Sequence, residues 1–169
     1  MKLKRILRHL LTTDGAVRRA FTASALSAIE SAITTSETSH FGQIRFAVEG
    51  ALDGTALFGG QSSSERAIEV FSRLRVWDTE HNNGLLIYLL LADRAVEIVA
   101  DRGIHVKVGS DAWREICSDM EAAFRQSNYE SGVVAGVAAV AEQLANHFPA
   151  SEAIANELSD APVVLRHDQ

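Results

Sequence analysis

Residues 77–103 read WDTEHNNGLLIYLLLADRAVEIVADRG and predict the centre of a sheet. A polar loop ends at Gly84, and the apolar run 85–91 that follows is typical of a strand buried on both faces. After a short break, residues 95–100 are rich in β-branched side chains and predict a second strand. Two strands joined by so short a break are antiparallel neighbours.

The expected register of this hairpin brings polar groups together. With Asp93 and Arg94 as a two-residue turn, Gly84 lies opposite Gly103. The segments 82–84 and 101–103 then meet at one end of the sheet. The sequence therefore predicts a cluster of acidic, amide and basic groups there.

A third strand precedes the hairpin. Residues 43–49 (QIRFAVE) alternate in polarity, as is typical of a strand with one strongly apolar face. A glycine-rich loop over 50–64 and a helix over 65–76 follow, with an N-cap signal in Ser62–Glu65. Strand, helix and strand at this spacing form a right-handed crossover, so 43–49 and 85–91 are expected to be parallel.

The remaining elements complete an α/β fold. Helical spacing predicts helices over 17–33, 110–125 and 130–148, and weak alternation leaves a fourth short strand open at 104–108. We therefore expect a three-layer α/β/α sandwich, with a small mixed sheet of three or four strands and helices on both faces. The expected organisation is a basic amphipathic arm or helix (1–11), one domain (12–149) and a tail (150–169) of at most two helical turns before a mobile end.

Composition limits the classes of function. The chain has 169 residues, a net charge of −6 and one cysteine, which indicates a single domain without internal disulfides and argues against nucleic-acid binding. Residues 1–20 nevertheless carry six basic side chains against Asp14 alone. We expect neither a signal peptide nor a membrane span, and place the protein in the cytoplasm, with peripheral attachment to the inner membrane as an alternative.

The first eleven residues have two interpretations. Their apolar residues form one helical stripe. One interpretation is an arm that touches an anionic membrane surface or an envelope protein, and the other is a first helix packed on the domain. The stripe consists of Leu3, Ile6, Leu7, Leu10 and Leu11.

Three segments carry a resemblance to a known family. NNGLLIYLLLADR (82–94), EIVADRGI (97–104) and FRQSNYESGVVAGV (124–137) resemble the TPM domain, which thylakoid-lumen phosphatase-like proteins, photosystem repair factors and many bacterial proteins share. The likeness runs over about residues 11–148 and is closest to a bacterial branch without a signal peptide or membrane helix. It implies binding of divalent cations, calcium in particular, and in some members a weak acid phosphatase activity.

The polar loops supply candidate ligands for such a cation. Hard cations take several oxygen ligands from carboxylates, amides and carbonyls. The alternative is a solvated loop whose asparagines serve turn geometry. A second polar group around the first strand is a further option, with its Glu49 end near the usual ligand position of α/β sheets. It consists of Glu37, His40, Arg45 and Glu49, with Asp53 and Asp93 at the Glu49 end. The predicted metal ligands are Asp78, Glu80, Asn82, Asn83, Asp101 and Asp111.

The predicted function is a non-catalytic one. We expect a calcium-binding or other divalent-cation-binding module, or a module that interacts with a protein or a membrane. The alternative is a weak, cation-dependent acid phosphatase. In that case Arg94 and Arg102 would hold phosphate, and Asp78 or Asp101 would act as the base.

Overall fold

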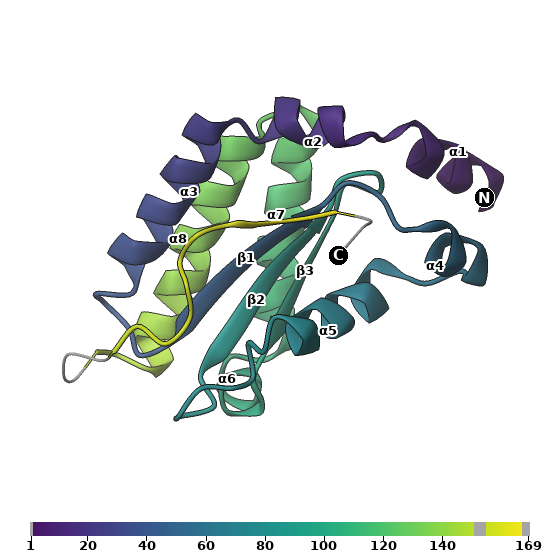
Figure 1. The fold of residues 1–169 in the computed structure, drawn as a ribbon. Coiled ribbons are helices and arrows are strands. Elements are labelled where there is room, and N and C mark those ends of the chain that lie inside the picture. The colour runs from purple at the N-terminus through teal and green to yellow at the C-terminus, as the bar shows by residue number, and fades with distance from the viewer. Residues whose placement is uncertain (1, 151–154, 167–169) are drawn as a thin grey trace.

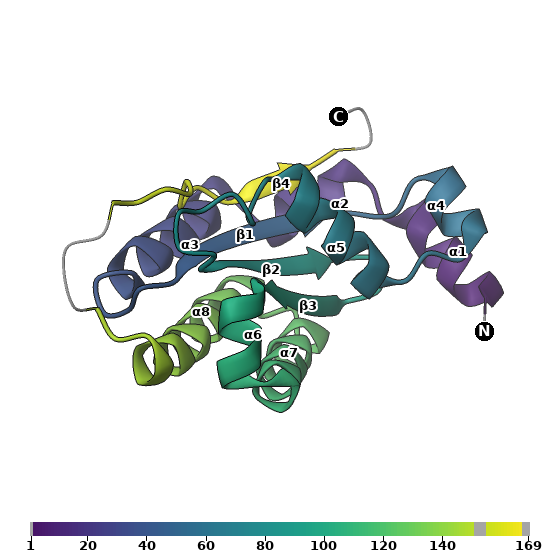
Figure 2. The same ribbon diagram turned by 90° about the horizontal axis from the view of Figure 1, so that it is seen from below.

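The computed structural model describes residues 2–150 and 155–166. Its centre is a four-stranded mixed sheet in the order β3-β2-β1-β4 (Figures 1 and 2). Strand β1 is parallel to β2 and to β4, and β2 is antiparallel to β3, so the predicted crossover and hairpin are both confirmed. The strands are β1 (Gln43–Glu49), β2 (Gly84–Leu90), β3 (Ala95–Ala100) and β4 (Val163–Leu165).

Helices cover both faces of the sheet, which confirms the predicted three-layer sandwich (Figure 1). One face carries α2 (Asp14–Ala20), α3 (Ala23–Ser36), α6 (Arg102–Val108), α7 (Ser110–Arg125) and α8 (Tyr129–His147). The other face carries α5 (Ser63–Arg73) and the tail segment that leads into β4. Helices α1 (Lys2–Leu11) and α4 (Gly54–Gly59) pack on each other beside this second layer.

Strand β2 is the centre of the core. All seven of its residues are buried, because their side chains alternate between the two helical layers. Leu85, Ile87 and Leu89 join the layer of α3, α7 and α8, whereas Leu86 and Tyr88 face α5. The continuous apolar run of this strand is therefore the signature of burial on both faces, as predicted.

The hairpin forms, but the predicted register is wrong by two residues. Leu90 pairs with Ala95 and Leu85 with Ala100, so four residues make the turn instead of two. The last of them, Arg94, has a φ of 52°, and this left-handed conformation turns the backbone into β3. Gly84 therefore lies beside Asp101, whose backbone N–H donates to its carbonyl, and not beside Gly103. The two polar ends still meet, as expected.

Three segments differ from the prediction. Residues 104–108 belong to α6 and form no strand, because Ile104 and Val108 are one helical turn apart and both pack on the core. The predicted loop over 50–64 contains α4, which Asp53 caps. The predicted helix over 17–33 is divided in two, since Thr22 caps α3 through its side chain.

The tail supplies the fourth strand, although it was expected to be mobile. Residues 163–165 pair with β1, whose outer edge would otherwise be open. The side-chain oxygen of Gln43 fixes the approach by accepting hydrogen bonds from the backbone N–H groups of Glu157 (2.8 Å) and Leu158 (3.1 Å). The helical turn predicted within 151–158 falls partly outside the described residues, and 155–158 is irregular.

Candidate functional sites at the two ends of the sheet

The parallel pair β1 and β2 gives the sheet two chemically different ends. At the amino end, where both strands begin, Gln43 lies beside Gly84. At the carboxyl end, where both strands finish, Glu49 lies beside Leu90. Each end holds acidic side chains that were singled out from the sequence, and their partners differ.

Asp101 is fixed at the amino end by the backbone of Gly84. Its Oδ2 accepts a hydrogen bond from the Gly84 N–H at 2.9 Å. A Cβ on Gly84 would lie 1.9 Å from the carbonyl oxygen of Val76 and 3.1 Å from Asp101 Oδ2, so this position requires glycine. Burial raises the pKa of the Asp101 carboxyl, and the Gly84 N–H offsets this effect only in part.

Asn83 is the buried amide of this end, with 3 % of its surface exposed. Its Nδ2 donates to the carbonyl of Phe41 at 2.5 Å, whereas its Oδ1 is buried without a hydrogen-bond partner among residues 2–150 and 155–166. The neighbouring Asn82 has a φ of 50°, a conformation that asparagine tolerates better than most residues. This unpartnered amide oxygen, on the residue before Gly84, is an oxygen ligand of the kind predicted there.

The structure distributes the other predicted ligands around this end. Asp78 and Glu80 are exposed, and the backbone N–H of Glu80 donates to the carboxylate of Glu157 at 2.9 Å. Asp111 lies in the first turn of α7, paired with Arg114, and the seven residues of α6 separate it from Asp101. Within residues 2–150 and 155–166, no three His, Cys, Asp or Glu side chains are grouped to hold a metal ion. The six-ligand cation site stays a prediction.

Glu37 is a second half-buried acid at the amino end. One of its oxygens accepts a hydrogen bond from the backbone N–H of Ile44 at 2.7 Å, at the start of β1. Burial raises the pKa of this carboxyl to about 7, against the opposing effect of the Ile44 N–H. Like Asp101, Glu37 has a backbone N–H as its partner and no cationic side chain in contact within the described part of the chain.

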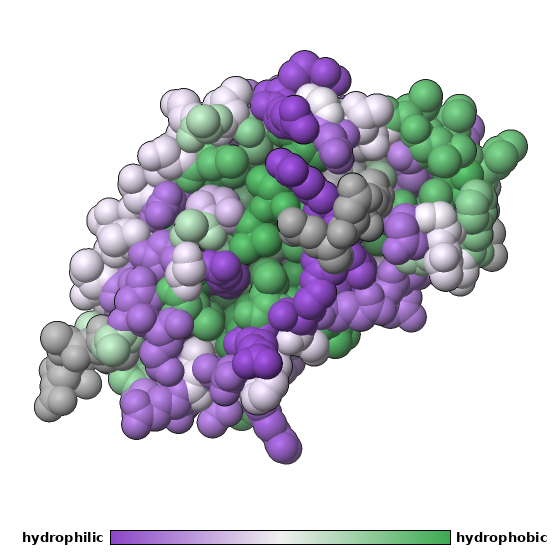
Figure 3. All heavy atoms as spheres, in the orientation of Figure 1, coloured by the Kyte–Doolittle hydropathy of each residue, from purple (hydrophilic) through white to green (hydrophobic). Residues whose placement is uncertain are grey.

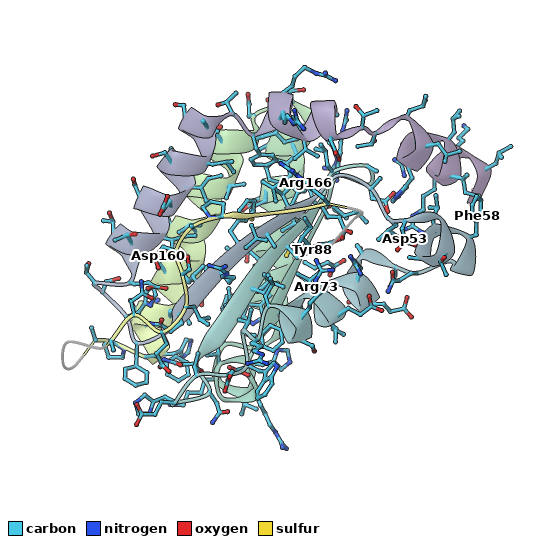
Figure 4. All side chains as sticks on the ribbon, in the orientation of Figure 1. Asp53, Phe58, Arg73, Tyr88, Asp160 and Arg166 are labelled. Atoms are coloured by element: carbon cyan, nitrogen blue, oxygen red, sulfur yellow. The ribbon has the colours of Figure 1, made fainter. Side chains whose placement is uncertain are left out.

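At the carboxyl end, Glu49 belongs to a buried ion pair. Arg66 from α5 binds both of its oxygens, at 2.9 Å and 2.8 Å, and the Tyr88 hydroxyl donates to it at 2.6 Å. Tyr88 lies fully buried on the sheet (Figure 4), and its pKa is raised by burial and by the Glu49 charge. This triad joins β1, β2 and α5, so it is a structural element of the core and leaves no group of Glu49 open to a ligand.

Asp93 attaches α1 to the sheet at the same end. Its carboxylate lies 2.8 Å from Arg5, 3.0 Å from Arg8 and 3.2 Å from His9 Nε2. The other nitrogen of His9, Nδ1, accepts a hydrogen bond from the Leu52 N–H, and burial lowers the pKa of this imidazole. The basic side of the helix therefore faces the domain.

This orientation turns the leucine side of α1 toward solvent. Leu3 is 79 % exposed, Leu7 56 %, Leu10 65 % and Leu11 70 %. Phe58 of α4, beside α1 in Figure 4, is 69 % exposed, and hydrophobic residues gather over α1 and α4 in Figure 3. None of the helices in the described ranges is long and apolar enough to cross a membrane.

Sequence reasoning included a first helix packed on the domain, but it missed the partner that holds α1. Arg5, Arg8 and His9 are spaced as one helical face opposite the leucines, which is a signal that the sequence contains. Their acceptor, Asp93, is more than eighty residues away and appears in the sequence as a turn residue. The partner of Glu49 was equally hidden, because Arg66 belongs to the crossover helix.

Comparison with known proteins agrees with this fold. The TPM domain matches residues 17–143, which is most of the chain. The NMR structure of the BA42 protein from the psychrophilic bacterium Bizionia argentinensis is similar, with a TM-score of 0.72 and 29 % sequence identity, over 85 % of this chain and 94 % of that one. None of the curated proteins matches. The chain belongs to the TPM domain family.

Proposed function

We propose that this TPM domain is a non-catalytic module that docks on an anionic membrane surface through the leucine face of α1. The observation that carries the proposal is the orientation of α1, with four leucines turned outward while Arg5, Arg8 and His9 hold the helix on Asp93. A helix fixed by its polar side presents a preformed apolar face. We define this leucine face as Leu3, Leu7, Leu10 and Leu11.

The size of the exposed surface suits reversible attachment. Full burial of a leucine side chain contributes about 1.5–3 kcal/mol, so four leucines at an acyl boundary give an appreciable affinity. The exposed cations of this region, Lys4, Arg18 and Arg19, would each add about 1 kcal/mol at an anionic surface. The chemistry of the flanking residues favours an anionic bilayer over a neutral one.

Vesicle flotation tests this function. Wild-type protein is expected to float with vesicles of phosphatidylcholine and phosphatidylglycerol, and less with phosphatidylcholine alone. A Leu7→Ser/Leu10→Ser variant should lose at least about fivefold in bound fraction, because two apolar anchors are removed while the Asp93 contacts stay.

The control is Val106→Ser, since Val106 of α6 is 74 % exposed and outside the leucine face. It should float like the wild type. Equal flotation of the leucine variant and the wild type would refute membrane docking. A wild-type dimer in sedimentation that the leucine variant dissociates, without flotation, would assign the face to a second copy of the chain instead.

A second candidate function is binding of calcium or another divalent cation at the amino end. The observation that favours it is Asp101, a carboxylate with a raised pKa whose hydrogen-bond donor among the described residues is the Gly84 N–H, together with the unpartnered Oδ1 of Asn83, the residue before Gly84. A hard cation would compensate the charge and use the free oxygen. Calorimetric titration with calcium should show binding that Asp101→Asn abolishes and Asp119→Asn, on α7, preserves. No heat at millimolar calcium would remove this candidate.

The weak phosphatase activity that the family resemblance implies is the less favoured alternative. It would use Asp78 or Asp101 as the base and Arg94 or Arg102 to hold phosphate. Arg94 follows the carboxyl end of β2, whereas Arg102 follows Asp101 at the amino end, so the two arginines lie on opposite ends of the sheet. Turnover of a chromogenic phosphate that Asp78→Ala and Asp101→Ala leave unchanged would indicate contamination.

A further inference from the structure

A cleft of about 970 Å³ lies beyond the carboxyl ends of the parallel strands. Its walls are the end of α1, helix α2, the β2–β3 turn and the turn between α7 and α8, which come together at the top of Figure 1. Ligands of α/β sheets usually bind outside the carboxyl ends of the parallel strands. None of the residues predicted from the sequence as metal ligands lines this cleft.

The lining of the cleft is cationic. Arg8, Arg19 and Arg94 line it, whereas Glu130 is the only acidic lining residue among those that the structure describes. Asp93 stands next to Arg94 in the turn, but Arg5, Arg8 and His9 already surround its carboxylate. Across the described part of the chain, neither Arg19 nor Arg94 lies within salt-bridge distance of a carboxylate, and both are exposed. Two guanidinium groups therefore remain available to an anion.

Neutral donors accompany these arginines. Ser127 and Ser131 belong to the lining and supply hydroxyls, whereas the hydroxyl of Thr12, which also lines the cleft, already donates to the Arg8 carbonyl. Helix α8 begins in the same wall, and the Asn128 side chain does not cap it, so the N–H groups of its first turn remain open to an anion. Guanidinium groups with hydroxyl and N–H donors are the set that proteins use for phosphate oxygens.

We propose that this cleft binds a phosphate group, held by Arg19 and Arg94 with Arg8 at its rim. The phosphate can belong to a soluble phosphate monoester or to the headgroup of a phospholipid, because the recognising chemistry is the same. Arg8 and Leu11 line the cleft on the helix that carries the leucine face, so a headgroup would be within reach of a docked domain. The proposal does not require membrane docking, since the cleft belongs to the folded domain.

The test is an NMR titration of the full ¹⁵N-labelled chain at constant ionic strength. The first probe is inorganic phosphate, and the second is dibutyryl phosphatidic acid, a soluble lipid that presents the headgroup without a bilayer. Saturable shifts of the Arg94 and 127–131 amides are expected. Shifts with inorganic phosphate show that the phosphate group alone is sufficient, as in a soluble ligand, and shifts with the short-chain lipid alone identify the headgroup.

Arg94→Gly is the informative variant. Arg94 has a φ of 52°, which glycine adopts without strain, so the substitution removes the guanidinium while the turn is preserved. Affinity for the probe should fall about tenfold, as it should in Arg19→Gln, because each loses a charge-assisted hydrogen bond. Arg114→Gln, which changes an exposed arginine of α7 outside the lining of the cleft, should bind as the wild type does.

Two results would overturn the phosphate site. One is the absence of saturable shifts with both probes, and the other is equal binding by Arg94→Gly, Arg19→Gln and the wild type. The leucine variant Leu7→Ser/Leu10→Ser separates this proposal from membrane docking. It should bind the soluble probes normally even where it no longer floats with vesicles.

Discussion

The two ends of the sheet hold buried or half-buried acids in contrasting surroundings. At the carboxyl end, Glu49 contacts Arg66, and Asp93 contacts Arg5 and Arg8. At the amino end, Glu37 and Asp101 each accept one backbone N–H and touch no cation. Their pKa values are accordingly raised by burial, to about 7 for Glu37.

This difference shows that the partner of a carboxylate, more than its burial, decides whether its charge is compensated within the protein. The charge of an acid that is surrounded by guanidinium groups is neutralised, and the ion pair links two elements of the fold. An acid whose only partner is a backbone N–H keeps an uncompensated charge, and it either takes up a proton or attracts a cation. The excess arginines at the carboxyl end and the unpaired acids at the amino end give the sheet opposite electrostatic ends.

The largest effect is predicted for a substitution that breaks the ion pair of Glu49. Glu49→Gln leaves Arg66 as a buried charge without its bidentate partner, so the free energy of unfolding should fall by about 3–5 kcal/mol. Glu69→Gln is the matched control, because Glu69 pairs with the same arginine at an exposed position. Its effect should stay below about 1 kcal/mol. Similar urea midpoints for the two variants would show that burial of the pair contributes nothing.

The next effect concerns the backbone that positions Asp101. Gly84→Ala places a methyl group 1.9 Å from the Val76 carbonyl oxygen, so the strand or the loop must shift. We expect a loss of about 2–3 kcal/mol in thermal or urea unfolding. Gly59→Ala, where a Cβ meets no atom within 4 Å, should be tolerated. Equal stability of the two variants would refute the close approach of the loop to Gly84.

The sequence predicts elements whose signals are local. The apolar run of β2, the alternation of β1 and the Ser62–Glu65 capping box all indicate the observed structure, because their periodicity and caps depend on neighbouring residues. The four-residue turn was missed since Leu91 extends the apolar run beyond the last paired residue, Leu90. The strand predicted over 104–108 was wrong for a similar reason, because so few residues fit both the two-residue period of a strand and the 3.6-residue period of a helix.

Contacts between distant segments could not be predicted in the same way. Residues 163–165 are too few to show alternation, and they form a strand only because β1 offers an open edge. The basic face of α1 was visible, but nothing near it in the sequence identifies Asp93 as its acceptor. The polar cluster at Gly84 could be predicted because the two strands of a hairpin are close in the sequence and also lie side by side in the fold.

A smaller and local effect is expected at Asp93. Asp93→Asn removes the charge that holds Arg5, Arg8 and His9, so α1 should loosen while the sheet stays folded. We expect a loss of about 1–2 kcal/mol, because Arg5 and Arg8 are partly exposed to solvent. Hydrogen exchange of the α1 amides should accelerate, with β2 amides unchanged. Asp119→Asn serves as the control, and uniform acceleration across the chain would contradict a local role.

The smallest effect is a pH dependence at Glu37, and its sign follows from the raised pKa. The folded protein holds this proton up to about pH 7, whereas the unfolded chain releases it near the ordinary value of 4.5. The folded state therefore binds more protons between these values, and the free energy of unfolding falls as the pH rises through that window. Glu37→Gln should lack this slope and gain about 1 kcal/mol relative to the wild type from pH 4.5 to 7. Parallel urea-derived stability curves for the two proteins would mean that Glu37 is ionised in the folded state, and the contrast between the two ends of the sheet would then rest on Asp101 alone.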